Sequence, residues 1–576
     1  MISRVYKGVH TARDVPWHKP DYTATGAWRP IVLSDGYARL LNSCKMEDLV
    51  SMCEKMGILP MNHFGGRPGR ATTDSIHLMV KMTKDAWRKG EVASLLCLDV
   101  KAVFPSVVVD FLLQEMRLCR IPEGHVEWFE RRLEERKTTL IFNDYRSDTF
   151  YIKEGIDQGD AHSLIAWLIY NHQILKVFKK TCKETGFLFV NDTAILVTGP
   201  DFNITHAKLR EVMVREGGVM EWARTHNCTF GMEMFQLLDL SRCKVKDPIR
   251  LRKRIPQPRS NMELNRQIIK STSSIKFLGL HIDRELRWKE QIAVAIGKGR
   301  EWLSQCRRLA KTSTGVASWQ IRRLYLGVVK PKMLYGADIF LGPAMHSETI
   351  KNRKGSCAAL NKLAAIQRSA AILIVGGFHL SPNDSLNMHA NLLPFHLLVD
   401  KVRFQAALRL ATLPTTHPLH KPVKQAAQRF VKKHHTLLHK LMYKFKLKPK
   451  LMEKIAATRL WARWEPDMTI RIANDKETAK REDRADKSCT KVYMDGSGMV
   501  LQFLSYMCCT HLFISFTYFL LDHFKNMCFT FIFHFCFNMH LTSSFHTCLF
   551  LACYICLPCL LHMFTLLWTW GLLVYK

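Results

Sequence analysis

Apolar and polar positions alternate most regularly between residues 90 and 245. The apolar run EVASLLCLDV (91–100) predicts a buried strand that ends near Asp99, and the two apolar runs of GFLFVNDTAILVTG (186–199) predict a β-hairpin. The polar pair Asn191-Asp192 lies at the tip of this hairpin. An acid at a tight turn, with an amide as its neighbour, needs a chemical explanation.

Helical spacing fills the segments between these strands. An apolar stripe over residues 76–87 predicts a helix that Thr73 and Asp74 can cap at its N-terminus. The same reasoning predicts an exposed helix (125–137), a hairpin (138–152), a long and partly buried helix (159–181) and a further helix (205–225). Strands that alternate with helices in this way indicate an α/β or α+β core.

Composition and pattern divide the chain into segments, without an internal repeat. The expected order is a loop-rich N-terminal segment (1–75), the strand-and-helix core (76–245), a basic Pro-containing linker (246–275), a hairpin with a mostly helical region (276–445), a charged linker (446–490), a short strand-like start (491–498) and an apolar Cys-rich tail (499–576).

The tail differs abruptly from the rest of the chain. It contains a single acid, Asp522, and holds 8 of the 18 cysteines. Its last apolar run (548–575) is long enough to be a transmembrane candidate. A non-coding or out-of-frame stretch explains the same change in composition, and we favour this interpretation over a membrane anchor.

Charge and cysteine usage narrow the class of protein. The chain has 84 Lys and Arg against 50 Asp and Glu, a net charge of +34. Such an excess favours a polyanionic partner, usually nucleic acid, although a merely basic solvated surface has the same composition. The cysteines before residue 490 are scattered, and the N-terminal stretch lacks an apolar signal-like run. We therefore expect a reducing compartment, the nucleus or the cytoplasm.

Two acids are candidates for metal chemistry. Asp99 ends the first predicted strand and Asp192 lies at the hairpin tip, so adjacent strands could bring them together. Carboxylates on strand ends can hold Mg²⁺, which prefers oxygen ligands. Two such ions stabilise the attacking and leaving oxygens of a phosphoryl displacement. A single Asp at a strand end can equally be a turn former.

Several segments, in this order, bear on the choice. They are LDVKAVFPSV (98–107), GIDQGDAHSLIAWLIYN (155–171), FVNDTAIL (189–196) and KFLGLHIDRELRWKEQ (276–291). Together they resemble motifs A, B, C and E of reverse transcriptases from non-LTR (LINE-type) retrotransposons. The segments WRPI (28–31) and FGGRPGRATTD (64–74) resemble the fingers motifs of that family, and residues 324–340 and 360–371 resemble its thumb region. The resemblance covers roughly residues 15–420.

The resemblance implies a fold and a set of partners. The fold is an α+β right hand with fingers, an RRM-like palm and a helical thumb. Asp99 and Asp192 match the metal ligands, which would hold Mg²⁺. The partners are an RNA template, a DNA primer and dNTPs.

The resemblance also implies roles for residues around the two acids. Phe104 matches the aromatic gate that clashes with a ribose 2′-OH, although a core phenylalanine is the alternative. Gln158 and Gly159 match the motif B turn against template and incoming nucleotide, where glycine allows close backbone approach. Arg67 and Arg70 fall in the fingers motif, where they either bind phosphates or are solvated loop arginines.

The chain departs from the family pattern at the hairpin tip. The pattern is aromatic-any-Asp-Asp, whereas Asn191 replaces the first acid here. An amide suits a tight turn but brings no negative charge to the metal ions. Motif B also lacks its usual proline, and Met234 stands where a basic residue is expected. We therefore expect an RNA-directed DNA polymerase that uses two-metal phosphoryl transfer and is impaired by Asn191.

The segment VYMDGSG (492–498) resembles the first strand of an RNase H domain, with Asp495 as its first metal ligand. Further acids that such a domain needs are missing downstream, so we expect a truncated start. The alternatives for the whole chain are a non-catalytic nucleic-acid-binding remnant or a pseudogene product. Membrane association through residues 499–576 is a further alternative, which we do not favour.

Overall fold

The computed structural model describes residues 4–10, 28–34, 36–101, 103–142, 145–247, 252, 254–310, 315–347, 350–353, 355–431, 433–456, 458 and 476–485. The chain divides into two units, residues 1–466 and 467–576. The second contributes one described helix, α17 (Lys476–Ala485). The predicted strand-like start with Asp495, and the apolar tail, lie outside the described residues.

A five-stranded antiparallel sheet forms the centre of the first unit. Its order is β10 (Gln236–Leu240), β3 (Val92–Lys101), β8 (Asp192–Gly199) and β7 (Glu184–Phe189), and β9 (Thr229–Phe230) pairs with the end of β3. The predicted strand at 91–100 and the predicted hairpin at 186–199 are thus confirmed, and they are neighbours.

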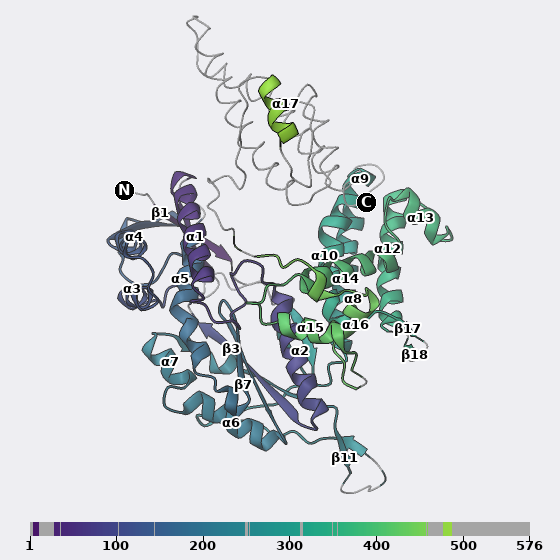
Figure 1. Ribbon diagram of the computed structural model, residues 1–576, viewed down its shortest axis with the longest axis horizontal. Coiled ribbons are helices and arrows are strands. Elements are labelled where there is room, and N and C mark those ends of the chain that lie inside the picture. Colours follow the sequence, from purple (N-terminus) through teal and green to yellow (C-terminus); the bar gives the residue numbers. More distant parts are fainter. Residues whose placement is uncertain are drawn as a thin grey trace, which may run out of the picture. The chain divides into compact units, whose positions relative to one another are not determined.

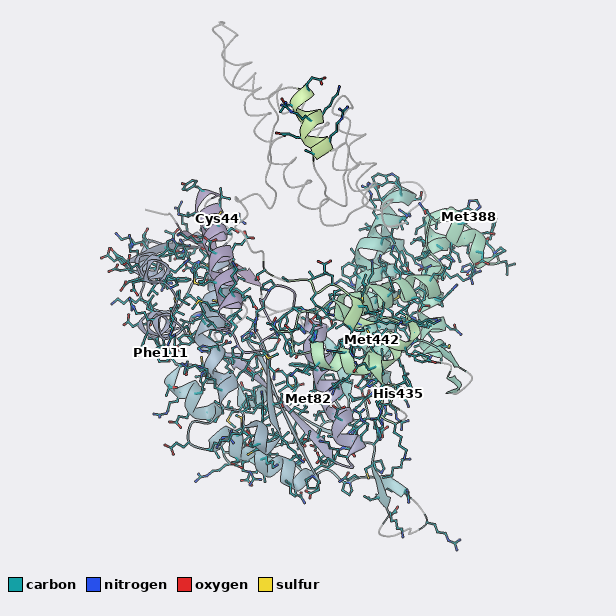
Figure 2. The ribbon with its side chains drawn as sticks, in the orientation of Figure 1. Cys44, Met82, Phe111, Met388, His435 and Met442 are labelled. Carbon is teal, nitrogen blue, oxygen red and sulfur yellow. The ribbon has the colours of Figure 1, made fainter. Side chains whose placement is uncertain are left out.

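Each face of this sheet packs against a different hydrophobic core. Ala93 and Leu95 of β3 belong to one core, whereas Leu96 and Leu98 belong to the other. Met82 and Phe111, labelled in Figure 2, pack against the first and the second core respectively. Because both faces are covered, the strand is apolar at nearly every position rather than at alternate ones.

Helices cover both faces of the sheet (Figure 1). The first face carries α2 (Thr72–Arg88). The second carries α3 (Val109–Leu118), α5 (Ala161–Asn171), α6 (Phe202–Val214) and α7 (Val219–Thr225). The predicted capping of α2 is correct for Asp74, whose carboxylate accepts from the Ala71 backbone N–H at 2.9 Å.

Two of the predicted helices are wrong in extent. The helix expected over 159–181 ends at Asn171 and is followed by the 3-10 turns η2 (His172–Lys176) and η3 (Lys180–Cys182). The helix expected over 205–225 is interrupted after Val214 and resumes at Val219, beyond Gly217 and Gly218. Glycines at a helix break expose the backbone and lower helix stability, so they separate the two pieces.

A second sheet and two helices precede and flank the motif B turn. The sheet has the order β2 (Trp28–Ser34), β1 (Arg4–His10), β4 (Arg136–Phe142) and β5 (Tyr145–Arg146), with β6 (Phe150–Ile152) paired to β4. The helices are α1 (Gly36–Lys55), which packs on α5, and α4 (Glu123–Leu133). The helix predicted over 125–137 therefore ends four residues early, because β4 begins at Arg136.

Short hairpins follow the central sheet. They are β11 (Lys244–Lys246) with β12 (Arg254–Pro256), β13 (Met262–Leu264) with β14 (Gln267–Ile269), and β15 (Ser274–Phe277) with β16 (Leu280–Asp283). The segment expected as a basic linker (246–275) thus contains paired strands. Met262 and Leu264 are buried in the second core, which anchors that segment to the sheet.

The remainder of the first unit is mainly helical. Its elements are α8 (Lys289–Leu309), α9 (Ser318–Leu324), the π-helix η5 (Tyr325–Val329), α10 (Lys330–Leu334), α11 (Ala337–Phe340), β17 (Met345–Ser347), β18 (Ile350–Arg353), α12 (Cys357–Val375), α13 (Asn383–His389), α14 (Phe395–Ala411), α15 (His420–Gln428), α16 (Leu437–Lys444) and η6 (Pro449–Leu451). Buried Asp74 of α2 forms an ion pair with Arg409 of α14, and His77 contacts Asp338 at 2.8 Å. These contacts fasten the helical region to the sheet.

One described helix, α12, is long and apolar enough to span a membrane by length and composition. Its residues Leu363, Ile366 and Ala370 are buried in the first core, beside α8 and α14. Packing of this kind is that of a core helix.

Candidate active site

The antiparallel pairing of β3 with β8 places the two predicted carboxylates directly opposite one another. Asp99 is the register partner of Asp192, and Asp192 also pairs with Phe189 across the hairpin. Opposite residues in such a pair have Cα atoms about 4.5–5.5 Å apart, so both carboxylates can reach one ion. The structure therefore brings together two acids that lie far apart in the sequence.

Asn191 lies in the hairpin turn and faces the same group. Its side-chain Nδ2 donates to Oδ1 of Asp99 at 3.5 Å. Asn191 itself does not adopt a left-handed backbone; the preceding residue, Val190, does, with φ of 60°. A β-branched residue at positive φ is strained, so this turn needs support from its surroundings.

That support comes from α5, behind the turn. The Val190 carbonyl accepts hydrogen bonds from Trp167 Nε1 at 2.8 Å and from Asn171 Nδ2 at 3.0 Å. Trp167 and Asn171 are four residues apart on one helix and therefore share a face. Two donors on one carbonyl fix the orientation of the turn.

A second segment supports the turn from the other side. His63 Nε2 lies 3.1 Å from Asn171 Oδ1 and donates to it, because the amide oxygen can only accept. Burial lowers the pKa of His63 to about 3, so the ring is neutral. The next residues run along β7, where the Phe64 N–H donates to the Leu188 carbonyl at 2.7 Å. A Cβ on Gly65 would lie 2.4 Å from Val190 N, so only glycine fits there.

Trp167, Asn171 and His63 were missed by sequence reasoning. A signal existed for Asn171, since a polar side chain at a position of helix α5 that is almost fully buried must find partners. The sequence could not show that the partner is the turn carbonyl beside the catalytic candidates.

The two carboxylates lack a protein cation. Within the described ranges, no ion pair to Asp99 or Asp192 is found. Burial, together with the charge of Asp99, raises the pKa of Asp192 to about 6. Lys101, the nearest basic residue along β3, is paired with Glu233 instead. Uncompensated carboxylates with an amide beside them match the oxygen ligands that Mg²⁺ prefers.

The motif B turn lies between the end of β3 and strand β2. The Ile156 N–H donates to the Phe104 carbonyl, and the Val32 N–H donates to the Gln158 carbonyl, both at 2.8 Å. Gly159 has φ of 101°, and an added Cβ would lie 2.8 Å from Ile31 Cγ2. Phe104 is partly buried and packs against the second core. These contacts unite residues of three predicted motifs.

Next to this turn, Asp160 belongs to a compensated cluster, which we call the Asp160 network (Asp160, Arg132, His162 and Asn42). Asp160 pairs with Arg132 and accepts from Asn42 Nδ2 at 2.9 Å. Burial by itself raises the pKa of Asp160, but the hydrogen bond to His162 and the charges of His162 and Arg132 lower it overall. Burial lowers the pKa of His162, so Arg132 supplies the compensating charge at neutral pH.

Arg67 and Arg70 lie in the loop before α2. Arg67 is only 8% exposed, and its guanidinium donates to Glu54 and to the carbonyl of Pro60. Arg70 donates to the Met61 carbonyl at 2.5 Å and lies 5.7 Å from the Phe64 ring centre. Burial lowers the pKa of Arg70 to about 10, which leaves it charged at neutral pH. Both arginines thus have internal partners, and their predicted contacts with phosphate stay predictions.

The sequence matches a known family. Residues 17–282 match the model described as reverse transcriptase (RNA-dependent DNA polymerase). The chain is 21% identical over 365 residues to the probable RNA-directed DNA polymerase from transposon X-element of Drosophila melanogaster, covering 62% of this chain and 37% of that protein. It is 20% identical over 364 residues to the RNA-directed DNA polymerase from mobile element jockey of the same species, covering 60% and 37%.

The chain thus spans little more than a third of the length of these relatives. Among solved structures, telomerase from Candida tropicalis in complex with a fragment of telomeric RNA aligns at 10% identity with a TM-score of 0.36, covering 69% of this chain and 62% of that one. A score this low indicates only a distant likeness.

Proposed function

We propose that this chain, which carries a reverse transcriptase domain of the LINE (non-LTR) type, is the polymerase segment of a retrotransposon. Its reaction would be template-directed addition of dNTPs to a DNA primer on an RNA template. The observation that carries this proposal is the register of β3 and β8, which pairs Asp99 with Asp192 and leaves both without a protein cation.

Asp99 and Asp192 would hold the divalent ions, Mg²⁺ by family expectation. When bound, these ions stabilise the charge that develops on the attacking and leaving oxygens of phosphoryl transfer. The raised pKa of Asp192 supports this assignment, because a cation would relieve the repulsion from Asp99. Phe104 would exclude a ribose 2′-OH, and Gln158 with Gly159 would lie against the template and the incoming nucleotide.

Asn191 weakens this site. Its amide donates to Asp99, so it occupies a carboxylate oxygen and contributes no charge of its own. The loss of one charged ligand costs several kcal/mol of transition-state stabilisation, or roughly three decades in rate. We therefore propose a polymerase whose activity is severely reduced.

The basic charge of the chain supports nucleic-acid partners, since each phosphate contact releases counterions. We propose an RNA template, a DNA primer and dNTPs as partners, the nucleus or cytoplasm as location, and a truncated RNase H start at Asp495. The phosphate contacts of Arg67 and Arg70 would require their internal partners to be exchanged.

The test is Mg²⁺-dependent primer extension on an RNA template by the full chain and by its Asn191→Asp variant. The matched control is Asn265→Asp, because Asn265 is also a hairpin-turn asparagine but is exposed. We expect trace extension by the natural chain and by the control, and about a thousandfold more by Asn191→Asp. Full activity of the natural chain would contradict the impairment, and inactivity of a folded Asn191→Asp variant would contradict the polymerase assignment.

Asn191 also favours a second function, binding of RNA or an RNA–DNA duplex without catalysis. Such a module would bind RNA with an affinity that falls steeply with salt, and it would do so equally in the natural chain and in Asn191→Asp. The affinity measured over a salt series, beside the extension assay, separates the two functions.

A further inference from the structure

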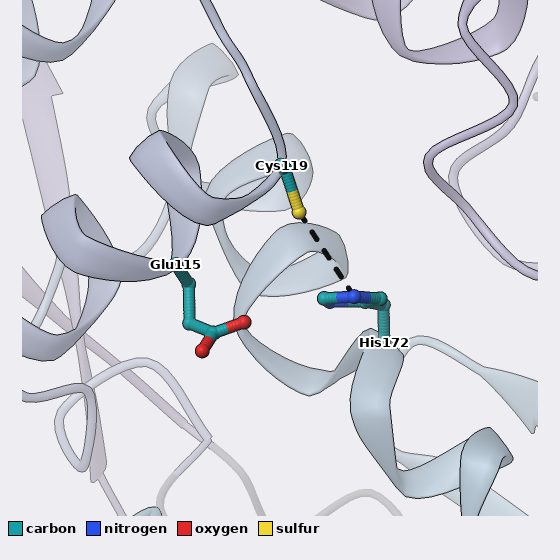
Figure 3. A group of neighbouring side chains, drawn as sticks. All are labelled: Glu115, Cys119 and His172. Carbon is teal, nitrogen blue, oxygen red and sulfur yellow. Dashed lines mark hydrogen bonds between the residues drawn. The ribbon is translucent and has the colours of Figure 1, made fainter.

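Three ligand-type side chains converge behind the sheet, away from the hairpin tip. Glu115 lies on α3, Cys119 follows that helix as its C-cap residue, and His172 begins η2 at the end of α5 (Figure 3). One ligand atom of each lies within 4.8 Å of the others. Glu115 and His172 are each only 3% exposed.

The histidine has its metal-binding nitrogen available. His172 Nδ1 donates to the Ile169 carbonyl at 2.7 Å, which leaves Nε2 of the neutral ring with a free lone pair. This nitrogen faces Cys119 Sγ at 3.9 Å (Figure 3). Histidines that bind metals commonly donate their other ring N–H to a backbone carbonyl in this way.

The carboxylate of Glu115 has an unsolved charge. Its Oε2 accepts from Gln173 Nε2 at 2.5 Å. No ion pair to Glu115 occurs within the part of the chain that the structure describes. A buried carboxylate without a cationic partner is costly. One dication bound to this carboxylate and to a thiolate would make the cluster neutral.

We propose that Glu115, Cys119 and His172 bind a zinc ion, with water as the fourth ligand. Sulfur, nitrogen and oxygen donors in a tetrahedron are the usual ligand set of Zn²⁺. Bond lengths of about 2.3 Å to sulfur and about 2.0 Å to nitrogen place the two donors about 3.5 Å apart in a tetrahedron. The observed separation of 3.9 Å needs only a small contraction. Cys119 is half-buried, so water can reach the fourth position.

The other cluster of this kind does not support the same inference. Asp157, Asp160 and His162 also lie within reach of one another, but Arg132 and Arg136 form ion pairs with the two carboxylates. A cation there would compete with two guanidinium groups. The cluster around Glu115 has no such competitor in the described ranges.

The zinc site would be structural. It would join α3 to the end of α5, where His172 directly follows Asn171, one of the two donors to the Val190 carbonyl. A metal at His172 would thus fix the helix end that holds the hairpin turn. Glu115, Cys119 and His172 would act as positioning residues, since none of them reaches the Asp99–Asp192 pair through a contact found here.

The test measures metal in the full chain and in two variants, Cys119→Ser and His172→Asn. Asparagine keeps a donor near the position of Nδ1 while it removes Nε2. The control is Cys44→Ser, because Cys44 is a half-buried free thiol on α1, away from the cluster (Figure 2). The chain has 18 cysteines, so the difference between variants, rather than total zinc, identifies the site.

We expect each cluster variant to retain one equivalent of zinc less than the control and the natural chain. With Co²⁺ in place of zinc, the thiolate-to-cobalt absorption should fall by the share of one site in Cys119→Ser. A chelator should lower the thermal midpoint of the natural chain and of the control but not that of a cluster variant. Equal metal content and equal cobalt spectra in Cys119→Ser and Cys44→Ser would overturn the proposal. If one cluster variant fails to fold, Glu115→Gln takes its place with the same expected loss. None of these readouts depends on polymerase activity.

Discussion

Two acidic clusters lie close together in the sequence motifs but differ in charge compensation. The Asp99–Asp192 pair has no ion-pair partner within the described ranges, and the pKa of Asp192 is raised. The Asp160 network has Arg132 within its own walls, and the pKa of Asp160 is lowered. A carboxylate that lacks a protein cation is poised for an external one, whereas a compensated carboxylate stabilises the fold.

The largest effect should come from removing an acid of the uncompensated pair. In the Asn191→Asp background, Asp99→Asn should lower primer extension about a thousandfold, because the metal site loses a charged ligand. Asp110→Asn, an exposed acid on α3, is the control and should leave the rate unchanged. Single-turnover extension on an RNA template measures both, and equal rates would remove Asp99 from the site.

In the compensated cluster, removal of the cation should cost stability instead. Arg132→Ala would leave Asp160 buried without its guanidinium, which should lower the free energy of unfolding by about 3–5 kcal/mol. The control is Arg131→Ala, the adjacent arginine, whose side chain is 74% exposed and pairs with Glu127. Its loss should cost less than about 1 kcal/mol. Urea unfolding of both variants measures the difference, and similar midpoints would contradict the compensation.

The pH dependence should follow the lowered pKa of Asp160. Because this pKa is lower in the folded than in the unfolded chain, the contribution is present above about pH 4 and is lost as the pH falls below it. Asp160→Asn should therefore flatten the loss of stability on the acid side. Urea midpoints measured as the pH is lowered test this. An unchanged slope in the variant would show that Asp160 does not titrate differently in the two states.

The smallest effect concerns the support of the turn. Trp167→Phe should cost about 1 kcal/mol of stability, because the Val190 carbonyl loses one of two donors. Trp222→Phe is the control, since Trp222 is also buried but its Nε1 has no hydrogen-bond partner in the described structure. In the Asn191→Asp background, Trp167→Phe should also lower kcat more than it raises KM. A larger loss in Trp222→Phe than in Trp167→Phe would argue against the clamp.

Much of the site could be predicted from local pattern. Apolar runs located β3 and the β7–β8 hairpin, and the order of the motifs identified Asp99, Asp192 and the amide at Asn191. Helix ends were less predictable, as the break after Asn171 illustrates. Residues 159–181 are apolar enough to continue as a helix, and packing against the sheet decides where it stops.

The sequence by itself determined which segments are strands, that two acids end them, and that one expected acid is an amide. Only the tertiary structure decided that Val190 takes the positive φ, that Trp167 and Asn171 hold its carbonyl, and that Arg67 has internal partners. It also decided that Glu115, Cys119 and His172 meet. The physical reason is that periodicity depends on neighbours along the chain, whereas burial and charge compensation depend on segments that meet only after folding.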